Sequence, residues 1–252
     1  MIDLHSHVLP GVDDGPETLA GSLDILRAAA EDGIARIAAT PHVRDDFPTT
    51  AEAMERGVVG LNAAARDAGI AVEVLTGGEI DREFAHSLDD ETLRRFGLGG
   101  NPGVLLLEFP YHGWPPELRE LVFRLAVRGF QVVLAHPERN RDVQQSPGRL
   151  EELVDAGVLV QLTAGSLDGR LGRPAEACAR TLLDEELAHL IASDAHAPAI
   201  RAVGMAAAAA AVGDAPLARW LTEDVPYALV TGSPPPPRPR ARQHRLRLRR
   251  RH

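Results

Sequence analysis

The chain has 252 residues and a formal net charge of −9, from 36 acidic and 27 basic residues. All the basic residues are arginines, and eight of them lie between Arg238 and Arg251, so residues 1–237 carry 36 acids against 19 arginines, a net charge of −17. This acidic body argues against nucleic-acid binding. The single cysteine, Cys178, excludes internal disulfides and a cysteine-rich zinc site. A hydrophobic share of 44% excludes disorder throughout the chain.

Short β-branched runs alternate with longer helical patterns along the chain. The patterns predict strands at residues 2–4, 34–39, 71–75, 104–108, 131–135, 158–162 and 189–192. They predict helices near residues 18–31, 50–68, 117–128, 148–156, 174–186, 198–212 and 216–230. Gly33 and Gly129 stand just before strands, where a glycine that ends a helix belongs. Repeated αβ units with apolar strands favour an α/β fold with a parallel sheet, and seven strands in about 230 residues favour a closed β/α barrel.

The last segment, residues 233–252, reads SPPPPRPRARQHRLRLRRRH, Pro-rich and then Arg-rich. We expect residues 1–232 to form one domain and this segment to be an extended, disordered tail. The opening MIDLHSHVLP lacks the basic and apolar regions of a signal peptide. The longest apolar run, residues 205–212, is far shorter than the roughly 20 residues of a membrane span, so we expect a cytoplasmic protein.

Residues that can bind metals follow six of the seven predicted strands. In chain order they are His5, His7, Asp13, Asp14, His42, Glu79, Glu108, His136, Asp194 and His196. The carboxyl ends of the strands of a β/α barrel open onto one face, so these side chains are expected to converge. A lone histidine after a strand is more often structural, but this joint pattern predicts a metal site.

Imidazole and carboxylate ligands together suit Zn²⁺, Fe²⁺ or Mn²⁺. The set is too large for one ion and fits two or three ions that share a bridging carboxylate. Such a centre suits phosphoryl displacement. The chain has no lysine to carboxylate, so Glu79 is the natural bridge. A cysteine-type tyrosine phosphatase has arginine six residues after its nucleophile, whereas the sixth residue after Cys178 is Asp184.

The motifs DLHSHVLPGVDDGP, ATPH, GGEI, LLEFP, LAHPERN and ASDAH resemble the polymerase and histidinol phosphatase (PHP) family of metal-dependent phosphoesterases. Within it they are most similar to the bacterial protein-tyrosine phosphatases of capsular and exopolysaccharide biosynthesis. The resemblance implies a distorted seven-stranded β/α (TIM-like, PHP) barrel and three divalent ions, usually Mn²⁺, with Fe or Zn as alternatives. It implies one ion on His5, His7, Glu79 and Asp194, a second on Glu79, Glu108 and His136, and a third on Asp14, His42 and His196.

Two arginines are candidates for binding the phosphate, because a guanidinium matches phosphate geometry. Arg139 lies three residues after His136, and Arg201 follows the SDAH motif. Either could instead form a surface salt bridge. Asp13 is an alternative ligand or a turn residue. A further group either lines the substrate entrance or packs a loop: Tyr111, His112 and Trp114.

The leading functional hypothesis is hydrolysis of phosphotyrosine on protein, with the tail of a bacterial tyrosine kinase that regulates polysaccharide export as the substrate. The alternatives are a small-molecule phosphatase of the histidinol-phosphate phosphatase type, a nuclease, and a non-enzymatic binding module. The Arg-rich tail either makes weak contact with an anionic membrane or has no partner.

Overall fold

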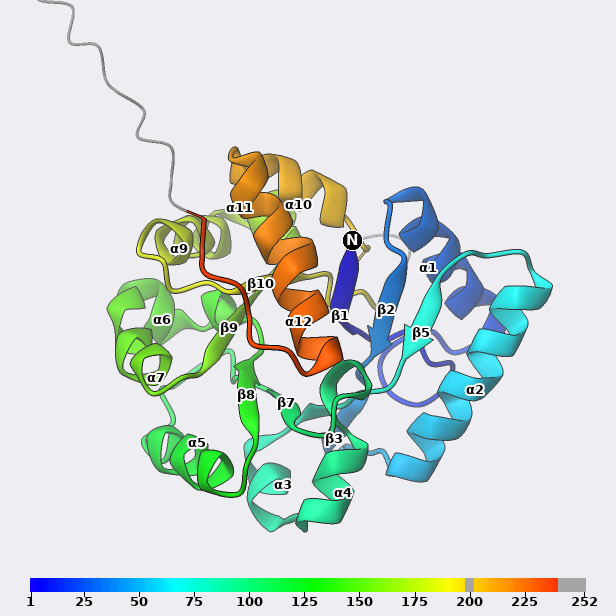
Figure 1. Ribbon diagram of the computed structural model, residues 1–252, viewed down its shortest axis with the longest axis horizontal. Coiled ribbons are helices and arrows are strands. Elements are labelled where there is room, and N and C mark those ends of the chain that lie inside the picture. Colours follow the sequence, from blue (N-terminus) through cyan, green and yellow to red (C-terminus); the bar gives the residue numbers. More distant parts are fainter. Residues whose placement is uncertain (198–201, 240–252) are drawn as a thin grey trace, which may run out of the picture.

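The computed structural model describes residues 1–197 and 202–239 of the chain (Figure 1). Its strands are β1 (Ile2–Ser6), β2 (Arg36–Ala39), β3 (His42–Arg44), β4 (Phe47–Pro48), β5 (Glu73–Leu75), β6 (Glu79–Ile80), β7 (Val104–Leu107), β8 (Gln131–Leu134), β9 (Leu159–Thr163) and β10 (Leu190–Ala192). All seven predicted strands are present, as β1, β2, β5, β7, β8, β9 and β10. The short strands β3, β4 and β6 were not predicted.

Helices follow most of the strands. The longer ones are α1 (Leu19–Glu31), α2 (Ala51–Asp67), α5 (Leu118–Val127), α9 (Arg173–Asp184), α10 (Met205–Val212) and α12 (Val225–Thr231). The shorter ones are α3 (Arg82–Ser87), α4 (Asp90–Arg95), α6 (Arg141–Gln145), α7 (Glu151–Asp155), α8 (Ala164–Leu167) and α11 (Ala215–Arg219). Single turns complete the set: η1 (Leu98–Gly100), η2 (Pro137–Arg139), η3 (Pro147–Leu150) and η4 (Trp220–Asp224).

The local sequence explains where the principal helices begin. The hydroxyls of Thr18 and Thr50 accept hydrogen bonds from backbone N–H groups three residues later, at 3.2 Å in each case, and so cap α1 and α2. Gly33 and Gly129 have positive φ angles between a helix and the next strand, as the sequence predicted. The helix predicted at residues 198–212 begins at Met205, and residues 198–201 lie outside the described chain.

The strands form two sheets. The first has the order β1-β2-β5 and the second the order β10-β9-β8-β7-β6-β3-β4, with every pairing parallel except β3 with β4. One parallel bridge, between Ser6 and Ala195, joins the end of β1 to the residues after β10. Within the described residues no sheet closes on itself, so the α/β class is confirmed but a closed seven-stranded barrel is not seen.

The break between the two sheets has a local cause. Only Thr40 and Pro41 separate β2 from β3, and residues 76–78 separate β5 from β6. Proline has no N–H to donate, and the two glycines at 77 and 78 have little β propensity, so the ladder of hydrogen bonds is interrupted here. Accordingly, β2 and β5 pair in the first sheet, and β3 and β6 in the second.

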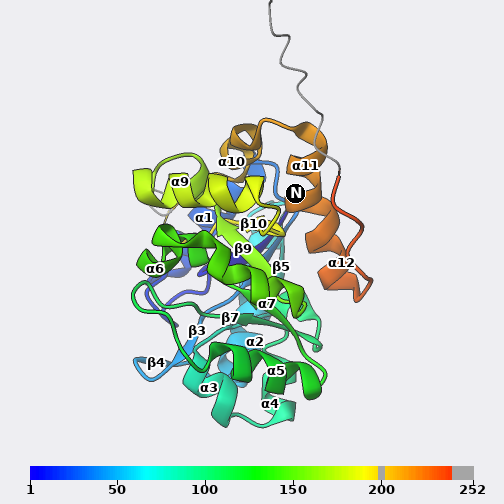
Figure 2. The same cartoon turned by 90° about the vertical axis from the view of Figure 1, so that its left-hand side faces the viewer.

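The helices lie outside the strands. Figure 1 shows α1 and α2 beside β2 and β5, and α3, α4 and α5 at the opposite side of the view from α10 and α11. Figure 2 shows α6, α7 and α9 covering one side of the strands. The strands are covered on both faces, and β7 (VLLL) is buried along its whole length. No helix in the described segments is both long and apolar enough to cross a membrane.

The beginning of the predicted tail is attached to the domain. Trp220 Nε1 donates to the Pro236 carbonyl at 2.8 Å. The Arg238 guanidinium donates to the carbonyls of Leu183 and Ala188 at 2.9 and 2.6 Å, and it lies over the Trp220 ring at 5.3 Å. Leu183 is in the last turn of α9, where unpaired carbonyls attract a cation. Residues 233–239 are thus held in place, although most are exposed, and residues 240–252 lie outside the described part.

Candidate metal centre

The structure brings all nine predicted metal ligands together at the carboxyl ends of the strands. Groups of these side chains have potential ligand atoms within 4.8 Å of one another. The groups are His7, Asp14, His42 and His196; His5, Glu79 and His136; His5, His7 and Asp194; and His42, Glu79 and Glu108. Seven of the nine residues are buried, Glu108 is largely buried, and Asp14 lies at the exposed rim.

The innermost pair is His5 and His7, whose Nε2 atoms are 3.3 Å apart. The backbone N–H of His136 points at Gln161 Oε1 from 3.3 Å, which identifies that atom as an acceptor, so His5 Nδ1 donates to it at 2.9 Å. His7 Nδ1 lies 2.6 Å from the carboxylate of Asp13 and is likewise the donor. Both Nε2 atoms therefore present lone pairs to each other.

Two carboxylates also face this pair. Glu79 Oε2 lies 3.4 Å from both Nε2 atoms, and Asp194 Oδ1 lies 3.5 Å from both. Four acceptors that face one another need a cation between them. Ligand atoms bound to one ion at about 2.1 Å lie roughly 3.0–3.4 Å apart at tetrahedral or octahedral angles, so the observed spacing fits a metal.

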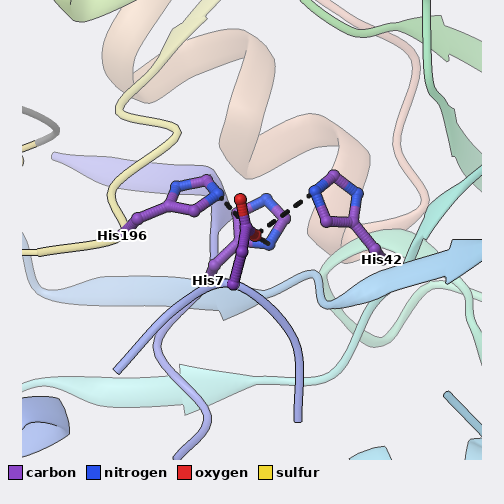
Figure 3. A group of neighbouring side chains, drawn as sticks. His7, His42 and His196 are labelled. Atoms are coloured by element: carbon purple, nitrogen blue, oxygen red, sulfur yellow. Dashed lines mark ion pairs between the residues drawn. The ribbon is translucent and has the colours of Figure 1, made fainter. Parts of the chain in front are cut away.

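A second group lies at the rim. His196 Nδ1 donates to the Asp194 backbone carbonyl at 2.9 Å, so its Nε2 faces Asp14 Oδ1 at 3.0 Å with a lone pair. His42 Nε2 lies 3.4 Å from the same carboxylate oxygen. Figure 3 shows the rings of His7, His42 and His196 turned toward one another, with the ion pairs dashed. The donors of this group are of the type that holds Mn²⁺, Fe²⁺ or Zn²⁺.

Glu79 lies between the groups. Its Oε1 is 2.9 Å from His136 Nε2, and its Oε2 is 2.9 Å from His42 Nδ1. Glu108 lies with His42 and Glu79, where its Oε2 is 3.9 Å from His42 Nδ1, and its Oε1 accepts from Arg44 at 2.7 Å. The resemblance grouped Glu108 with His136 instead. Glu79 is therefore a member of two of the groups of potential ligands.

The protonation of the cluster is strongly perturbed. Burial disfavours the imidazolium of His5, but Glu79 and Asp194 outweigh it and raise the pKa of His5 to about 9. Burial acts in the same way on His42, and Asp14 and Glu79 raise its pKa to about 10. Burial also tends to raise the pKa of Glu79, but the surrounding histidines hold it well below its usual value. Without a metal, His5 and His42 are therefore protonated at neutral pH, and their positive charges stand in place of a metal ion.

Three residues that the sequence did not single out as supports hold the ligands in place. Gln161, on the one strand whose end carries no ligand, fixes the ring of His5. Asp13 is not a direct ligand in this geometry, because its carboxylate accepts from His7 Nδ1, from the His42 backbone at 3.1 Å and from the Gly15 backbone at 3.0 Å. The buried Asp3 accepts from the backbones of His5 and Ser193. Such supports set tautomer and orientation.

Backbone geometry also aims the ligands. His136 and Asp194 have φ angles of 39° and 52°, and with Glu186 they are the non-glycine residues of the described chain with positive φ. This left-handed conformation is unfavourable for residues with a Cβ and is typical of functional sites. Gly15 is needed for a different reason, since a Cβ there would lie 2.3 Å from the His7 carbonyl oxygen.

The HPERN motif links the centre to the loop before it. Arg139 Nη1 donates to Asp194 Oδ2 at 2.5 Å, and its guanidinium lies over the Tyr111 ring at 4.6 Å. The buried Glu138 accepts from the Thr163 backbone and the Ser166 hydroxyl. Asn140 donates to the carbonyls of Pro110 and Gly113. The structure thus places Arg139 beside a predicted ligand, whereas Arg201 lies outside the described residues.

The aromatic residues named with this loop have different surroundings. Tyr111 stacks on His136 with ring centroids 5.6 Å apart and is 39% exposed, so it lies at the entrance to the centre. His112 is exposed beside it, and Trp114 packs edge-on against Phe109.

Cys178 is buried on α9, and burial raises the pKa of its thiol to about 12, which is unsuitable for a nucleophile.

Residues 1–216 match the family described as capsular polysaccharide synthesis, CpsB/CapC. The chain is 36% identical over 197 residues to the tyrosine-protein phosphatase YwqE of Bacillus subtilis (strain 168), with 78% of this chain and 77% of the relative covered. It is 27% identical over 202 residues to the tyrosine-protein phosphatase CpsB of Streptococcus agalactiae serotype III (strain NEM316), with 78% and 83% covered.

A solved structure supports the same relationship. It comes from a study of YwqE from Bacillus subtilis and CpsB from Streptococcus pneumoniae, described there as unique metal-dependent tyrosine phosphatases. The match has a TM-score of 0.81 and 31% sequence identity, and it covers 96% of this chain and 100% of the other.

Proposed function

The chain belongs to the CpsB/CapC family of capsular polysaccharide synthesis, and from this premise we propose that it is a metal-dependent protein-tyrosine phosphatase. The resemblance found in the motifs is thereby confirmed at the level of the family. The observation that carries the function is the pair of Nε2 atoms of His5 and His7, 3.3 Å apart and faced by two carboxylates. Relatives with the same fold are named metal-dependent tyrosine phosphatases.

We further propose that the cluster binds three divalent ions, with Mn²⁺ as the physiological metal. The four groups of ligands and the central position of Glu79 support more than one ion. When bound, such ions supply a nucleophile at neutral pH and offset the charge of the transferring phosphoryl group. The nine residues proposed to hold them are His5, His7, Asp14, His42, Glu79, Glu108, His136, Asp194 and His196.

The chain supplies the remaining parts of the reaction. We propose that the Arg139 guanidinium, held by Asp194 and the Tyr111 ring, uses its other N–H groups to bind the phosphate oxygens. Tyr111 lies at the entrance, where its ring can pack against the phenyl group of the substrate. Arg201 is proposed as a second phosphate contact from its place after the SDAH motif. The buried Cys178 takes no part.

We also infer that the two sheets act as one distorted seven-stranded barrel. In this reading β2 with β3, and β5 with β6, are single strands interrupted by a few residues, and the Ser6–Ala195 bridge connects the first strand to the last. The convergence of ligands from β1, β3, β6, β7, β8 and β10 supports this reading. We assign residues 1–232 to the phosphatase domain, with residues 233–239 packed on its surface.

The proposed substrate is a phosphotyrosine on a bacterial tyrosine kinase that regulates polysaccharide export. The names of the relatives as tyrosine-protein phosphatases and the capsule-synthesis family support it. We propose that the protein acts in the cytoplasm. We also propose that the Arg-rich segment after Arg238 makes weak contact with an anionic membrane, worth at most about 1 kcal/mol per arginine.

Hydrolysis of a phosphotyrosine peptide under a metal panel tests the function. Activity is expected to vanish with EDTA, to return with Mn²⁺, and to persist in Cys178→Ser. Activity that is indifferent to chelation would refute the proposal. Larger kcat/KM values for histidinol phosphate or DNA would favour a small-molecule phosphatase or a nuclease. Less than one metal ion per chain in well-folded protein would favour a binding module.

A further inference from the structure

A cavity of about 330 Å³ adjoins the metal centre on the side of the HPERN loop. Tyr111 and Arg139 line it, and the same two residues contact the predicted ligands His136 and Asp194. Leu171, just before α9, and Pro174, in its first turn, provide an apolar part of the wall. The cavity therefore lies next to the predicted ligands, on the far side of Tyr111 and Arg139.

The charge of this cavity differs from that of the body. None of the described residues that line it is acidic, although residues 1–237 carry a net charge of −17. Two arginines line it, Arg139 and Arg141. The neighbouring Asp142 is not one of the lining residues, and its carboxylate accepts from the Gly113 backbone at 3.0 Å. The cavity is thus a cationic recess on an anionic protein.

Arg141 is the arginine available for a ligand. Arg139 is held by Asp194 and the Tyr111 ring and is proposed to bind the phosphate, whereas the exposed Arg141 side chain makes no ion pair within the part of the chain that the structure describes. Its backbone N–H donates to the Tyr111 carbonyl at 3.1 Å, which fixes its position at the mouth. Gln144 uses its amide nitrogen on the Glu138 carbonyl and leaves its oxygen for a peptide N–H.

We propose that this cavity is a subsite for the residues next to the phosphotyrosine, and that Arg141 selects an acidic side chain there. The inference rests on the proposed phosphatase function and adds a sequence preference to it. An acidic flanking residue is attracted by the positive charge of Arg141 at the cavity, whereas the negative net charge of residues 1–237 repels it elsewhere on the surface. A basic flanking residue is disfavoured at the same place.

Matched peptides test the subsite. A phosphotyrosine in an alanine background is compared with peptides that carry one Glu, or one Arg, at each of the three positions on either side. Glu at one or more positions is expected to raise kcat/KM about 3- to 5-fold over alanine, the size typical of a partly exposed ion pair. Arg at the same position is expected to lower it, and added salt to reduce both effects.

Substitutions of Arg141 complete the test. Arg141→Ala is expected to abolish the preference for Glu, and Arg141→Glu to reverse it in favour of Arg. The control Arg66→Ala, at an exposed position on α2, is expected to keep the preference. Equal kcat/KM for all peptides, or a preference that survives both Arg141 variants, would overturn the inference.

Free phosphotyrosine separates the two levels of the proposal, because it has no flanking residue to fill the cavity. If the Mn²⁺-loaded protein hydrolyses free phosphotyrosine but does not distinguish the peptides, the subsite is wrong and the phosphatase function stands. If it hydrolyses neither free phosphotyrosine nor any peptide, the phosphatase function fails, and the subsite fails with it.

Discussion

Gln161 Oε1 accepts a hydrogen bond from His5 Nδ1 at 2.9 Å, and this one contact decides which nitrogen His5 presents to the metal centre. The same oxygen accepts the backbone N–H of His136 at 3.3 Å, so it also fixes the start of the HPERN turn. Both groups are buried. A neutral amide on β9 thereby orients two of the proposed ligands, which come from other strands.

Gln161→Leu is predicted to weaken metal binding. Leucine is similar in size but leaves the N–H groups of His5 and His136 without an acceptor, so His5 is no longer held with Nε2 inward. We expect an apparent Mn²⁺ affinity about 10-fold lower or more, measured by titration calorimetry, and a free energy of unfolding lower by about 1–3 kcal/mol. Gln145→Leu, at an exposed position on α6, is the control. Unchanged affinity in Gln161→Leu would disprove the positioning role.

Asp13→Asn is predicted to disturb His7 in the same manner. Both carboxylate oxygens of Asp13 accept N–H donors, and an amide can offer only one oxygen, so the variant must turn an NH₂ group toward another donor or force the other His7 tautomer. A loss of about 10- to 100-fold in Mn²⁺ affinity is expected, with Asp45→Asn, at an exposed position, unchanged. Equal affinities of Asp13→Asn and Asp45→Asn would show that Asp13 is only a turn residue.

These two supports mark where prediction from the sequence stopped. The convergence of the nine predicted ligands could be foreseen because each lies at or after the end of a predicted strand, and parallel strands bring their carboxyl ends to one edge. Gln161 lies within a strand rather than after one, so its contact with His5 depends on which strands pack together. The contact of Arg139 with Asp194 also depends on three-dimensional neighbours. The interruption at Pro41 has a local cause, but which sheet each short strand joins depends on the strands beside it.

The raised pKa values of His5 and His42 predict that the Tm of metal-free protein depends on pH and that bound metal removes this dependence. The pKa values of His5 and His42, about 9 and about 10, are raised above the ordinary 6.5, so their stabilising contribution is complete below pH 6.5 and is lost as pH rises through 9–10. The Tm of metal-free protein should fall between pH 7 and 10. With excess Mn²⁺ the Tm should not fall in this range, because the metal replaces those protons.

Proton release during Mn²⁺ titration checks the same point. Calorimetry in buffers of different ionisation enthalpy should detect protons leaving at pH 7–8, and the apparent affinity should decrease as pH is lowered. Binding without proton release would contradict the raised pKa values of His5 and His42.

His189 is predicted to make the domain sensitive to acid, independently of the metal centre. Burial lowers its pKa to about 4, and the nearby Arg238 guanidinium acts in the same direction. Between pH 6.5 and 4 the unfolded chain therefore binds a proton that the folded chain does not, and stability falls by up to roughly 2–3 kcal/mol. Arg238→Gln should raise this pKa and reduce the loss. If the free energy of unfolding falls by the same amount in the two proteins between pH 6.5 and 4, Arg238 has no effect on the pKa of His189.

The contacts of residues 233–239 predict that the stability of a truncated chain depends on whether these residues are kept. A chain that ends at residue 232 lacks the Pro236 carbonyl that accepts from Trp220 and the Arg238 guanidinium that caps α9. We expect it to lose about 1–3 kcal/mol of stability and to show red-shifted fluorescence of Trp220, which is 5% exposed in the full chain. A chain that ends at Pro239 keeps both contacts and should match the full chain in Tm and emission. If the chain ending at residue 232 matches the full chain in Tm, the contacts of Arg238 and Pro236 add no stability.

The chain ending at Pro239 is therefore the proper partner for testing the membrane contact, because it removes seven of the eight clustered arginines without disturbing the domain. Co-sedimentation with anionic liposomes should be stronger for the full chain and should decrease with salt, since the attraction is electrostatic. Equal sedimentation of the two chains would reject a membrane role for the arginines.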